Sequence, residues 1–366
     1  MMEKQNILFF AQQIYAPWIE WVKNNSIKIC EWLNKKIETN IISHKSSVNN
    51  KNKDVLFWVN IFYLLNLKDN KFLQLFYFII DSFKSLFFVV RTKPEKIFVQ
   101  YLDTSYLLSL ILIKIFKTKT DIILTIYSTD ELNIWYKKSF LKYYNFKKII
   151  IISEYLREDI FKLWYKNDDI IYIPLSYDRK RYLESADFNK RDKKTILFSA
   201  WPIEEAWSFF MVDLAKQMKD YNFIFAMRKF DKRSEEEVDK LKKYIKKNWV
   251  KNIEFKRNIL KMEDLLWRVG ALVLPLQDIN IKMLVPVALL EAMARWTTCF
   301  VSDLPNLEKL IDNNENWVIF NRNNIFDLKE KIIKNIWKKE LWEKSFNFAK
   351  KYPSFDEIVE EYYKLT

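Results

Sequence analysis

Apolar residues along this chain recur in two patterns, short runs typical of buried strands and longer stretches with helical spacing. In the first half, a mixed apolar run covers 54–65, and the other runs alternate between the two patterns. The strands are predicted at 6–11, 39–44, 96–101, 121–126, 148–152 and 170–173, and the helices at 23–36, 72–91, 106–116, around Lys138 and at 156–163. Strand and helix in alternation predict a parallel, doubly wound α/β sheet.

A charged break at 185–194 precedes a second alternation of the same kind. Its predicted strands are 195–199, 222–227, 252–255 and 271–276, and its predicted helices are 208–218, 235–247 and 262–268. A chain of 366 residues is also long enough for two domains. We therefore predict two Rossmann-like domains, 1–184 and 195–350, joined by the linker 185–194, with a last helical segment at 351–366.

The segment 285–319 organises the second domain. Apolar residues at helical spacing begin at Pro286, and one charge, Glu291, interrupts that face. Trp296 follows, where a helix that runs into a strand usually needs a residue with positive φ. Trp317 ends a polar turn of the same kind. Glycine is the residue expected at both positions.

Glycine occurs once in this chain, whereas tryptophan occurs 14 times. Several tryptophans fall where glycine would supply a turn, namely Trp18, Trp21, Trp201, Trp207 and Trp249. We interpret many of these positions as UGA codons that the source lineage translates as glycine. The alternative, a protein rich in tryptophan by selection, would place bulky side chains at repeated tight turns, at a cost in strain.

With Trp296 and Trp317 taken as glycine, the segment resembles the donor-site signature of family-4 retaining glycosyltransferases of the GT-B fold. Three weaker matches occur earlier in the chain, in the same order as in the family. YAPWIEW resembles its acceptor-side loop, KKIIIISEYLREDI its interdomain strand, and IIYIPLSYD its approach to the linker. The resemblance implies two Rossmann-like domains that face across a cleft. The end of the chain, KSFNFAKKYPSFDEIVEEYYKL, resembles the family's single terminal helix, with 351–366 crossing back to the N-terminal domain. The resemblance also places Trp18 and Trp21 in the acceptor-side loop.

The family carries two glutamates eight positions apart, the first near the donor sugar and the second at the ribose hydroxyls of the nucleotide. Glu291 matches the second, and Met283 stands at the first. A carboxylate suits ribose because it accepts two hydrogen bonds from a vicinal diol. The resemblance implies that the backbone amides of Met283, Leu284 and Val285 receive the diphosphate at the mouth of the next helix. For Glu291, the alternative is a carboxylate that only offsets that helix dipole.

The family's usual arginine and lysine after the first strand of the second domain are absent, and Trp201 opens the loop there. Arg228, Lys229 and Lys282 are the candidate phosphate contacts, with a solvated surface charge as an equal alternative for each. Tyr127 stands where the family often has a catalytic histidine. The only histidine, His44, is expected to be structural.

The formal net charge of +14 favours polyanions, either anionic lipid head groups or nucleic acid. Residues 72–90 are apolar but carry Asp81 and Lys84, which favours a buried or membrane-surface helix over a membrane span. Cys30 and Cys299 lack metal-ligand spacing, so we expect reduced core residues, no metal and no cofactor. Without a recognisable signal peptide, a cytoplasmic location is expected, with peripheral contact to the inner face of the membrane as an option.

Two functions remain open at this point. The first is a retaining glycosyltransferase that moves a sugar from a nucleotide-sugar to a glycan or lipid-linked acceptor. The second is a non-catalytic GT-B protein that binds nucleotide or glycan within an assembly complex. A nucleic-acid-binding protein has only the net charge in its favour, since no binding motif is recognisable.

Overall fold

A computed structural model describes most of the chain. The described residues are 6–11, 21–45, 53–56, 58–66, 71–116, 118–183, 191–200, 207–227, 232–257, 259, 261–278, 286–308 and 316–366. The predicted site residues that lie outside them are Trp18, Trp201, Arg228, Lys229, Lys282, Met283, Leu284 and Val285. Two compact units make up the chain: Met1–Pro174 with Asp356–Thr366, and Leu175–Phe355.

The first unit is built on a sheet of eight strands in the order β3-β4-β2-β1-β5-β6-β7-β8. The strands are β1 (Asn6–Ala11), β2 (Glu38–Lys45), β3 (Lys53–Leu56), β4 (Val59–Asn66), β5 (Lys96–Gln100), β6 (Asp121–Ile126), β7 (Lys148–Ile151) and β8 (Ile170–Tyr172). All neighbours pair in parallel except β3, which runs antiparallel to β4.

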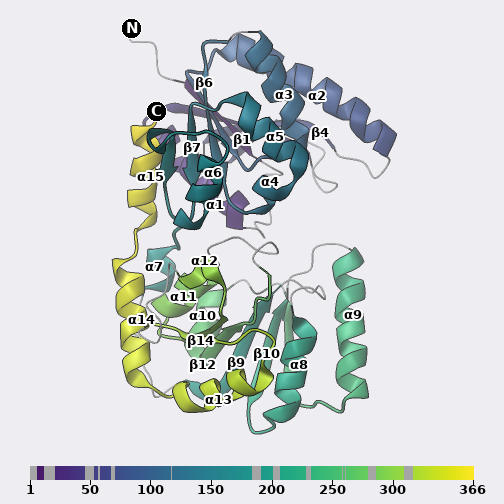
Figure 1. Cartoon of the computed structure of the whole chain (residues 1–366), viewed down its shortest axis with the longest axis vertical. Coiled ribbons are helices and arrows are strands. Elements are labelled where there is room, and N and C mark those ends of the chain that lie inside the picture. Colours follow the sequence, from purple (N-terminus) through teal and green to yellow (C-terminus); the bar gives the residue numbers. More distant parts are fainter. Residues whose placement is uncertain are drawn as a thin grey trace. The chain divides into compact units, whose positions relative to one another are not determined.

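Helices cover both faces of this sheet. They are α1 (Trp21–Asn34), α2 (Lys71–Thr92), α3 (Thr104–Ile115), α4 (Asp130–Asn133), α5 (Trp135–Tyr144), α6 (Arg157–Phe161) and α15 (Phe355–Lys364). Consecutive residues of a strand point to opposite faces. Accordingly, Phe9 stacks on Phe98 and, through it, reaches Tyr362 of α15, while Phe10 stacks on Tyr106 of α3. The helices α2 and α3 lie side by side (Figure 1).

The second unit has six parallel strands in the order β11-β10-β9-β12-β13-β14. The strands are β9 (Asp192–Ala200), β10 (Asn222–Met227), β11 (Ile253–Arg257), β12 (Val269–Leu274), β13 (Thr298–Ser302) and β14 (Val318–Phe320). Its helices are α7 (Arg179–Tyr182), α8 (Ser208–Gln217), α9 (Lys232–Lys247), α10 (Met262–Arg268), α11 (Val287–Ala294), α12 (Pro305–Glu308), α13 (Ile325–Asn335) and α14 (Lys339–Lys351). Both sheets are the doubly wound type that the alternation predicted.

One face of the second sheet packs against α8, α9 and α13 in a continuous buried core. The single glycine, Gly270, lies in β12 where a Cβ would meet the backbone oxygen of Lys193 at 2.9 Å. This glycine therefore permits a close approach of two backbones. It does not supply a turn.

Three boundaries differ from the sequence prediction. The run 54–65 is two strands, β3 and β4, with a turn at Trp58 between them. The expected terminal helix is two helices, because Pro353 cannot continue α14 and the chain restarts at Phe355 as α15. The two units divide at Pro174, ten residues before the expected linker, because α7 packs with the second unit.

Five of the nine described non-glycine residues with positive φ are tryptophan. They are Trp58 (65°), Trp164 (72°), Trp207 (58°), Trp249 (55°) and Trp296 (61°). A bulky residue there is a conformational outlier, whereas glycine takes this conformation without strain. The predicted left-handed geometry is therefore found at Trp207, Trp249 and Trp296. The prediction of left-handed geometry is wrong for Trp317, which is buried and does not have a positive φ. Trp21 is the first residue of α1 and does not have a positive φ either.

Candidate functional site

Glu291 is the fifth residue of α11, a helix of eight residues that is largely buried. Pro286 precedes this helix as its N-cap in an extended conformation. Within the helix, the side chains of Val287, Leu289 and Met293 are buried. Glu291 is only half-buried, so the polar position that interrupts the apolar pattern is also the one that keeps some solvent access. The helix thus holds one carboxylate at a fixed place on the surface of the second unit.

Tyr182 of α7 is the first neighbour of this carboxylate. The two side chains share a hydrogen bond in which the tyrosine hydroxyl donates. Burial raises the pKa of Tyr182 well above its ordinary value, and the charge of Glu291 raises it further, so the hydroxyl remains a donor at neutral pH. An ionised carboxylate has about four lone-pair positions, so the tyrosine donor does not by itself saturate such a group.

Arg181 lies beside the same carboxylate and pairs with a second one, Glu263 of α10, at 2.7 Å. Burial acts to raise the pKa of Glu263, but the hydrogen bond and charge of Arg181 outweigh it and the pKa is lowered. Glu263 therefore stays ionised, and the guanidinium of Arg181 lies close to both carboxylates. This cluster contains a cation that the sequence prediction did not name.

The end of α11 is fixed by a buried arginine from another element. Arg191, next to the start of β9, donates to the backbone carbonyls of Arg295 and Trp296, the latter at 2.8 Å. Burial and the nearby charge of Arg295 lower the pKa of Arg191 to about 10, so it still carries its proton at neutral pH. The left-handed Trp296 stacks on Phe346 with 4.2 Å between ring centroids. A cation at the last carbonyls of a helix complements its dipole.

Tyr127 follows β6 in the first unit, as predicted, but its side chain is buried. Its hydroxyl donates to Gln100 Oε1 at 2.5 Å, and Asn25 and Tyr362 are further polar neighbours. Burial raises the pKa of this hydroxyl well above its usual value. A group enclosed in this way cannot touch a sugar, which argues against the catalytic role predicted for it.

Glu131, at the start of α4, anchors the loop that carries Tyr127. Its carboxylate accepts hydrogen bonds from the backbone N–H groups of Leu102 at 2.6 Å, Tyr127 at 2.7 Å and Ser128 at 3.2 Å. Burial raises the pKa of Glu131 to about 7 although these hydrogen bonds act in the opposite direction. The carboxyl ends of β5 and β6 are thus tied together by one buried side chain.

Sequence reasoning missed Tyr182, Arg181, Glu263 and Glu131. A signal was present for Glu131, because an acidic residue five positions beyond a strand end suits a helix N-terminus. Arg181 and Tyr182 lie three and four residues after the IIYIPLSYD motif, but nothing in their spacing connects them with Glu291, more than a hundred residues later. His44 is buried against Asp81 at 3.8 Å and stacks on Tyr106, a structural setting as predicted. Cys30 and Cys299 are buried and form no disulfide.

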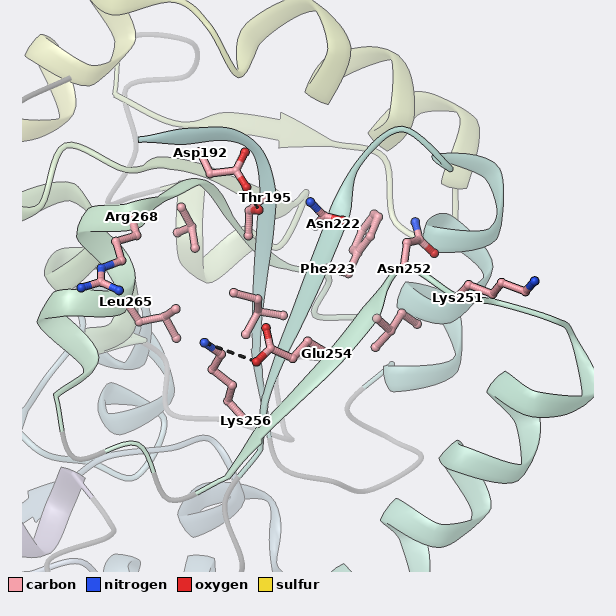
Figure 2. A pocket seen from close by; sticks show the side chains of 13 residues that line it. Asp192, Thr195, Asn222, Phe223, Lys251, Asn252, Glu254, Lys256, Leu265 and Arg268 are labelled. Carbon is pink, nitrogen blue, oxygen red and sulfur yellow. Dashed lines mark hydrogen bonds and ion pairs between the residues drawn. The ribbon is translucent and has the colours of Figure 1, made fainter. Parts of the chain in front are cut away.

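A cavity of about 440 Å³ opens at the amino ends of β9, β10 and β11 (Figure 2). Lys251, Lys256 and Arg268 line it together with Asp192 and Glu254, and Lys256 pairs with Glu254 at 3.4 Å. Ligands of open α/β sheets bind outside the carboxyl ends of the strands. This cavity is at the opposite edge, so we do not assign it to the donor.

In the described part of the chain, no three His, Cys, Asp or Glu side chains gather as metal ligands would. Within the same residues, no helix has both the length and the apolar character needed to cross a bilayer.

The sequence matches no protein-family model, and no curated protein matches it closely enough to count as a relative. Solved structures match over the whole chain. Sucrose-phosphate synthase from Thermosynechococcus elongatus has a TM-score of 0.80 at 12% identity, covering 99% of this chain and 98% of its own. HepE from Anabaena in complex with UDP has 0.78 at 10%, covering 99% of both chains. A glycosyltransferase from Rickettsia africae has 0.74 at 13%, covering 99% and 97%. The chain therefore has the GT-B fold, the fold that its resemblance to family-4 retaining glycosyltransferases implied.

Proposed function

We propose that this protein is a glycosyltransferase that moves a sugar from a nucleotide-sugar to a hydroxyl of a glycan or lipid-linked saccharide, with retention of configuration. The donor binds the second unit and the acceptor the first, as the resemblance implies. Support comes from the GT-B fold, which the chain shares with proteins solved in complex with UDP and with UDP-glucose, and from the position of Glu291.

Glu291 is the observation that carries the proposal. It belongs to the matched motif, it is the half-buried polar position of α11, and it accepts a hydrogen bond from Tyr182. In this proposal the carboxylate accepts hydrogen bonds from the two ribose hydroxyls, and Tyr182 and Arg181 hold it in place. The alternative, a carboxylate that offsets the helix dipole, fits less well, because Glu291 lies one turn inside α11 and bonds a tyrosine.

The reaction needs no protein nucleophile. The bond between the anomeric carbon and the phosphate oxygen breaks with both electrons going to the diphosphate. The acceptor oxygen bonds the same face of the carbon, and its proton passes to the leaving diphosphate. Such a step depends on stabilisation of the departing negative charge. A methionine at 283 and a buried Tyr127 are therefore compatible with transfer.

The test is binding and turnover with a panel of nucleotide-sugars. Calorimetry with UDP, UDP-glucose and other donors measures binding, and release of free nucleoside diphosphate measures transfer or hydrolysis. Binding together with turnover supports the enzyme. Binding without turnover on every acceptor supports the second candidate, a non-catalytic GT-B protein, which Met283 at the first motif position favours. Absence of nucleotide binding contradicts the enzyme and leaves only the glycan-binding form of the second candidate.

We place the protein in the cytoplasm, at the inner face of the membrane, where a lipid-linked acceptor is available. The formal net charge of +14 supports such a placement, because the surface of that leaflet is anionic.

A further inference from the structure

The outer face of α2 carries an apolar stripe. Phe76, Ile79, Phe83, Phe87 and Val90 succeed one another at spacings of three and four residues, and each is between 40% and 66% exposed. Residues at these spacings lie on one side of a helix. The stripe is about 20 Å long at 1.5 Å per residue.

The inner face of the same helix is of mixed character. Asp81, Ser82 and Ser85 are buried there beside Leu86 and Val89, with Ser82 donating to the carbonyl of Phe78 and Asp81 close to His44. A surface helix of a water-soluble protein normally keeps its large apolar residues on the inner face. The exposed phenylalanines of α2 therefore indicate that its outer face is covered by something other than water.

The neighbouring helix α3 also exposes apolar residues. The two helices pack directly, with Ser82 Oγ 3.3 Å from Ser109 Oγ. Ile111 and Ile115 of α3 and its C-cap residue Phe116 are exposed. Together α2, α3 and this C-cap supply eight of the nineteen exposed large hydrophobic residues in the described part of the chain. We call these eight residues the α2–α3 face.

The charged residues that these two helices expose are basic. Lys84, Arg91 and Lys114 are exposed, and the only acidic residue of either helix, Asp81, is buried. Two copies of such a face would bring like charges together, which disfavours a self-complementary dimer. An anionic lipid surface suits both features, because acyl chains accept the phenylalanines while lipid phosphates pair with the cations.

We propose that the α2–α3 face binds the surface of an anionic lipid bilayer, with α2 lying in the plane of the interface. The phenylalanines enter the boundary between head groups and acyl chains, and Lys84 and Arg91 remain among the head groups. This inference gives the proposed enzyme access to an acceptor held in the membrane, but its test does not depend on glycosyl transfer.

The experiment is co-sedimentation with vesicles of phosphatidylcholine alone and of phosphatidylcholine mixed with phosphatidylglycerol. The wild-type protein is expected to bind the anionic vesicles, and less so at high salt because screening weakens the contribution of the cations. The double variant Phe83→Ser/Phe87→Ser should bind at least about tenfold more weakly, since it removes two side chains that would enter the bilayer. A double charge reversal, Lys84→Glu/Arg91→Glu, should abolish the preference for anionic lipid.

The matched control is Phe326→Ser/Ile333→Ser, which removes two exposed apolar residues from α13 of the second unit. It should bind vesicles like the wild type. Sedimentation velocity without lipid identifies the competing occupant, because a dimer that dissociates in the Phe83→Ser/Phe87→Ser variant would show that a second copy covers this face. Unchanged vesicle binding in that variant would also overturn the inference. Calorimetry with UDP on the same proteins separates this outcome from failure of the proposed function.

Discussion

Glu131 accepts the backbone N–H of Tyr127 at 2.7 Å while its other oxygen accepts that of Leu102 at 2.6 Å. The two acceptors belong to one buried carboxylate, and the two donors lie just past the ends of adjacent strands, β6 and β5. Polar backbone groups at buried strand ends need partners. One side chain thus fixes the shape of the carboxyl edge of the first sheet.

Glu131→Gln should destabilise the first unit by about 1 to 3 kcal/mol, because the amide nitrogen would face a backbone N–H that now bonds an oxygen. Thermal unfolding followed by circular dichroism measures the effect. Glu158→Gln, on the exposed side of α6, is the control and should change little. Equal melting temperatures for wild type and Glu131→Gln would show that the loop does not depend on this carboxylate.

The same residue predicts a pH dependence. Its pKa is raised to about 7 in the folded protein from an ordinary value of 4.5, so between these values the folded state binds the proton more tightly than the unfolded state. Stability is then highest below about pH 4.5 as far as this group is concerned, and falls by roughly 3 kcal/mol as pH rises through about 7. Comparing melts of wild type and Glu131→Gln across this range isolates the contribution, which should be absent from the variant. A wild-type profile parallel to that of the variant would contradict the prediction.

Much of the fold follows from the sequence because buried parallel strands are continuous apolar runs, and β1, β6 and β10 lie at the predicted residues. The α14–α15 break was missed although Pro353 signals it, because the apolar spacing continues past the proline. The partners of Glu291 could not be predicted at all. Tyr182 contacts Glu291 only because α7 packs on α11. The pattern of residues along the chain does not indicate this packing.

Glu291→Gln should raise the dissociation constant for a bound nucleotide-sugar by about tenfold or more, since a hydrogen bond to a charged group contributes roughly 1.5 to 3 kcal/mol. Tyr182→Phe keeps the carboxylate but removes the hydroxyl that holds it, so a smaller loss is expected. Calorimetry with UDP-glucose measures both. Glu254→Gln, at the opposite edge of the sheet, is the control. Unchanged affinity for Glu291→Gln would remove this residue from the donor site.

Arg191→Lys should destabilise the second unit by about 1 to 3 kcal/mol. An ammonium group cannot reproduce the fork that reaches the carbonyls of Arg295 and Trp296 together, and a buried carbonyl would lose its donor. The control is Arg322→Lys, whose side chain pairs with Asp303 at the surface and should matter little. Urea unfolding compares the two variants, and equal midpoints would mean that Arg191 does not stabilise the end of α11.

The tryptophans give the sharpest prediction, because their backbone geometry divides them into classes. Trp58, Trp164 and Trp249 combine positive φ with side chains 71% to 87% exposed, so glycine there relieves strain and removes little packing. Each replacement by glycine should stabilise the protein by about 1 to 3 kcal/mol. Trp135 is equally exposed but is helical, and its replacement by glycine should give no gain.

Replacement of a buried tryptophan should have the opposite effect on stability. Trp317 is 2% exposed with no positive φ, and its replacement by glycine should cost about 3 to 5 kcal/mol through the cavity left behind. Melting temperatures of the five single variants test this ordering. The codons of the gene test the recoding hypothesis. UGA codons are expected at Trp58, Trp164, Trp207, Trp249 and Trp296, the positions where the backbone is left-handed. UGG codons at these five positions, or melts in which the Trp249→Gly protein is no more stable than the Trp135→Gly protein, would contradict the recoding hypothesis.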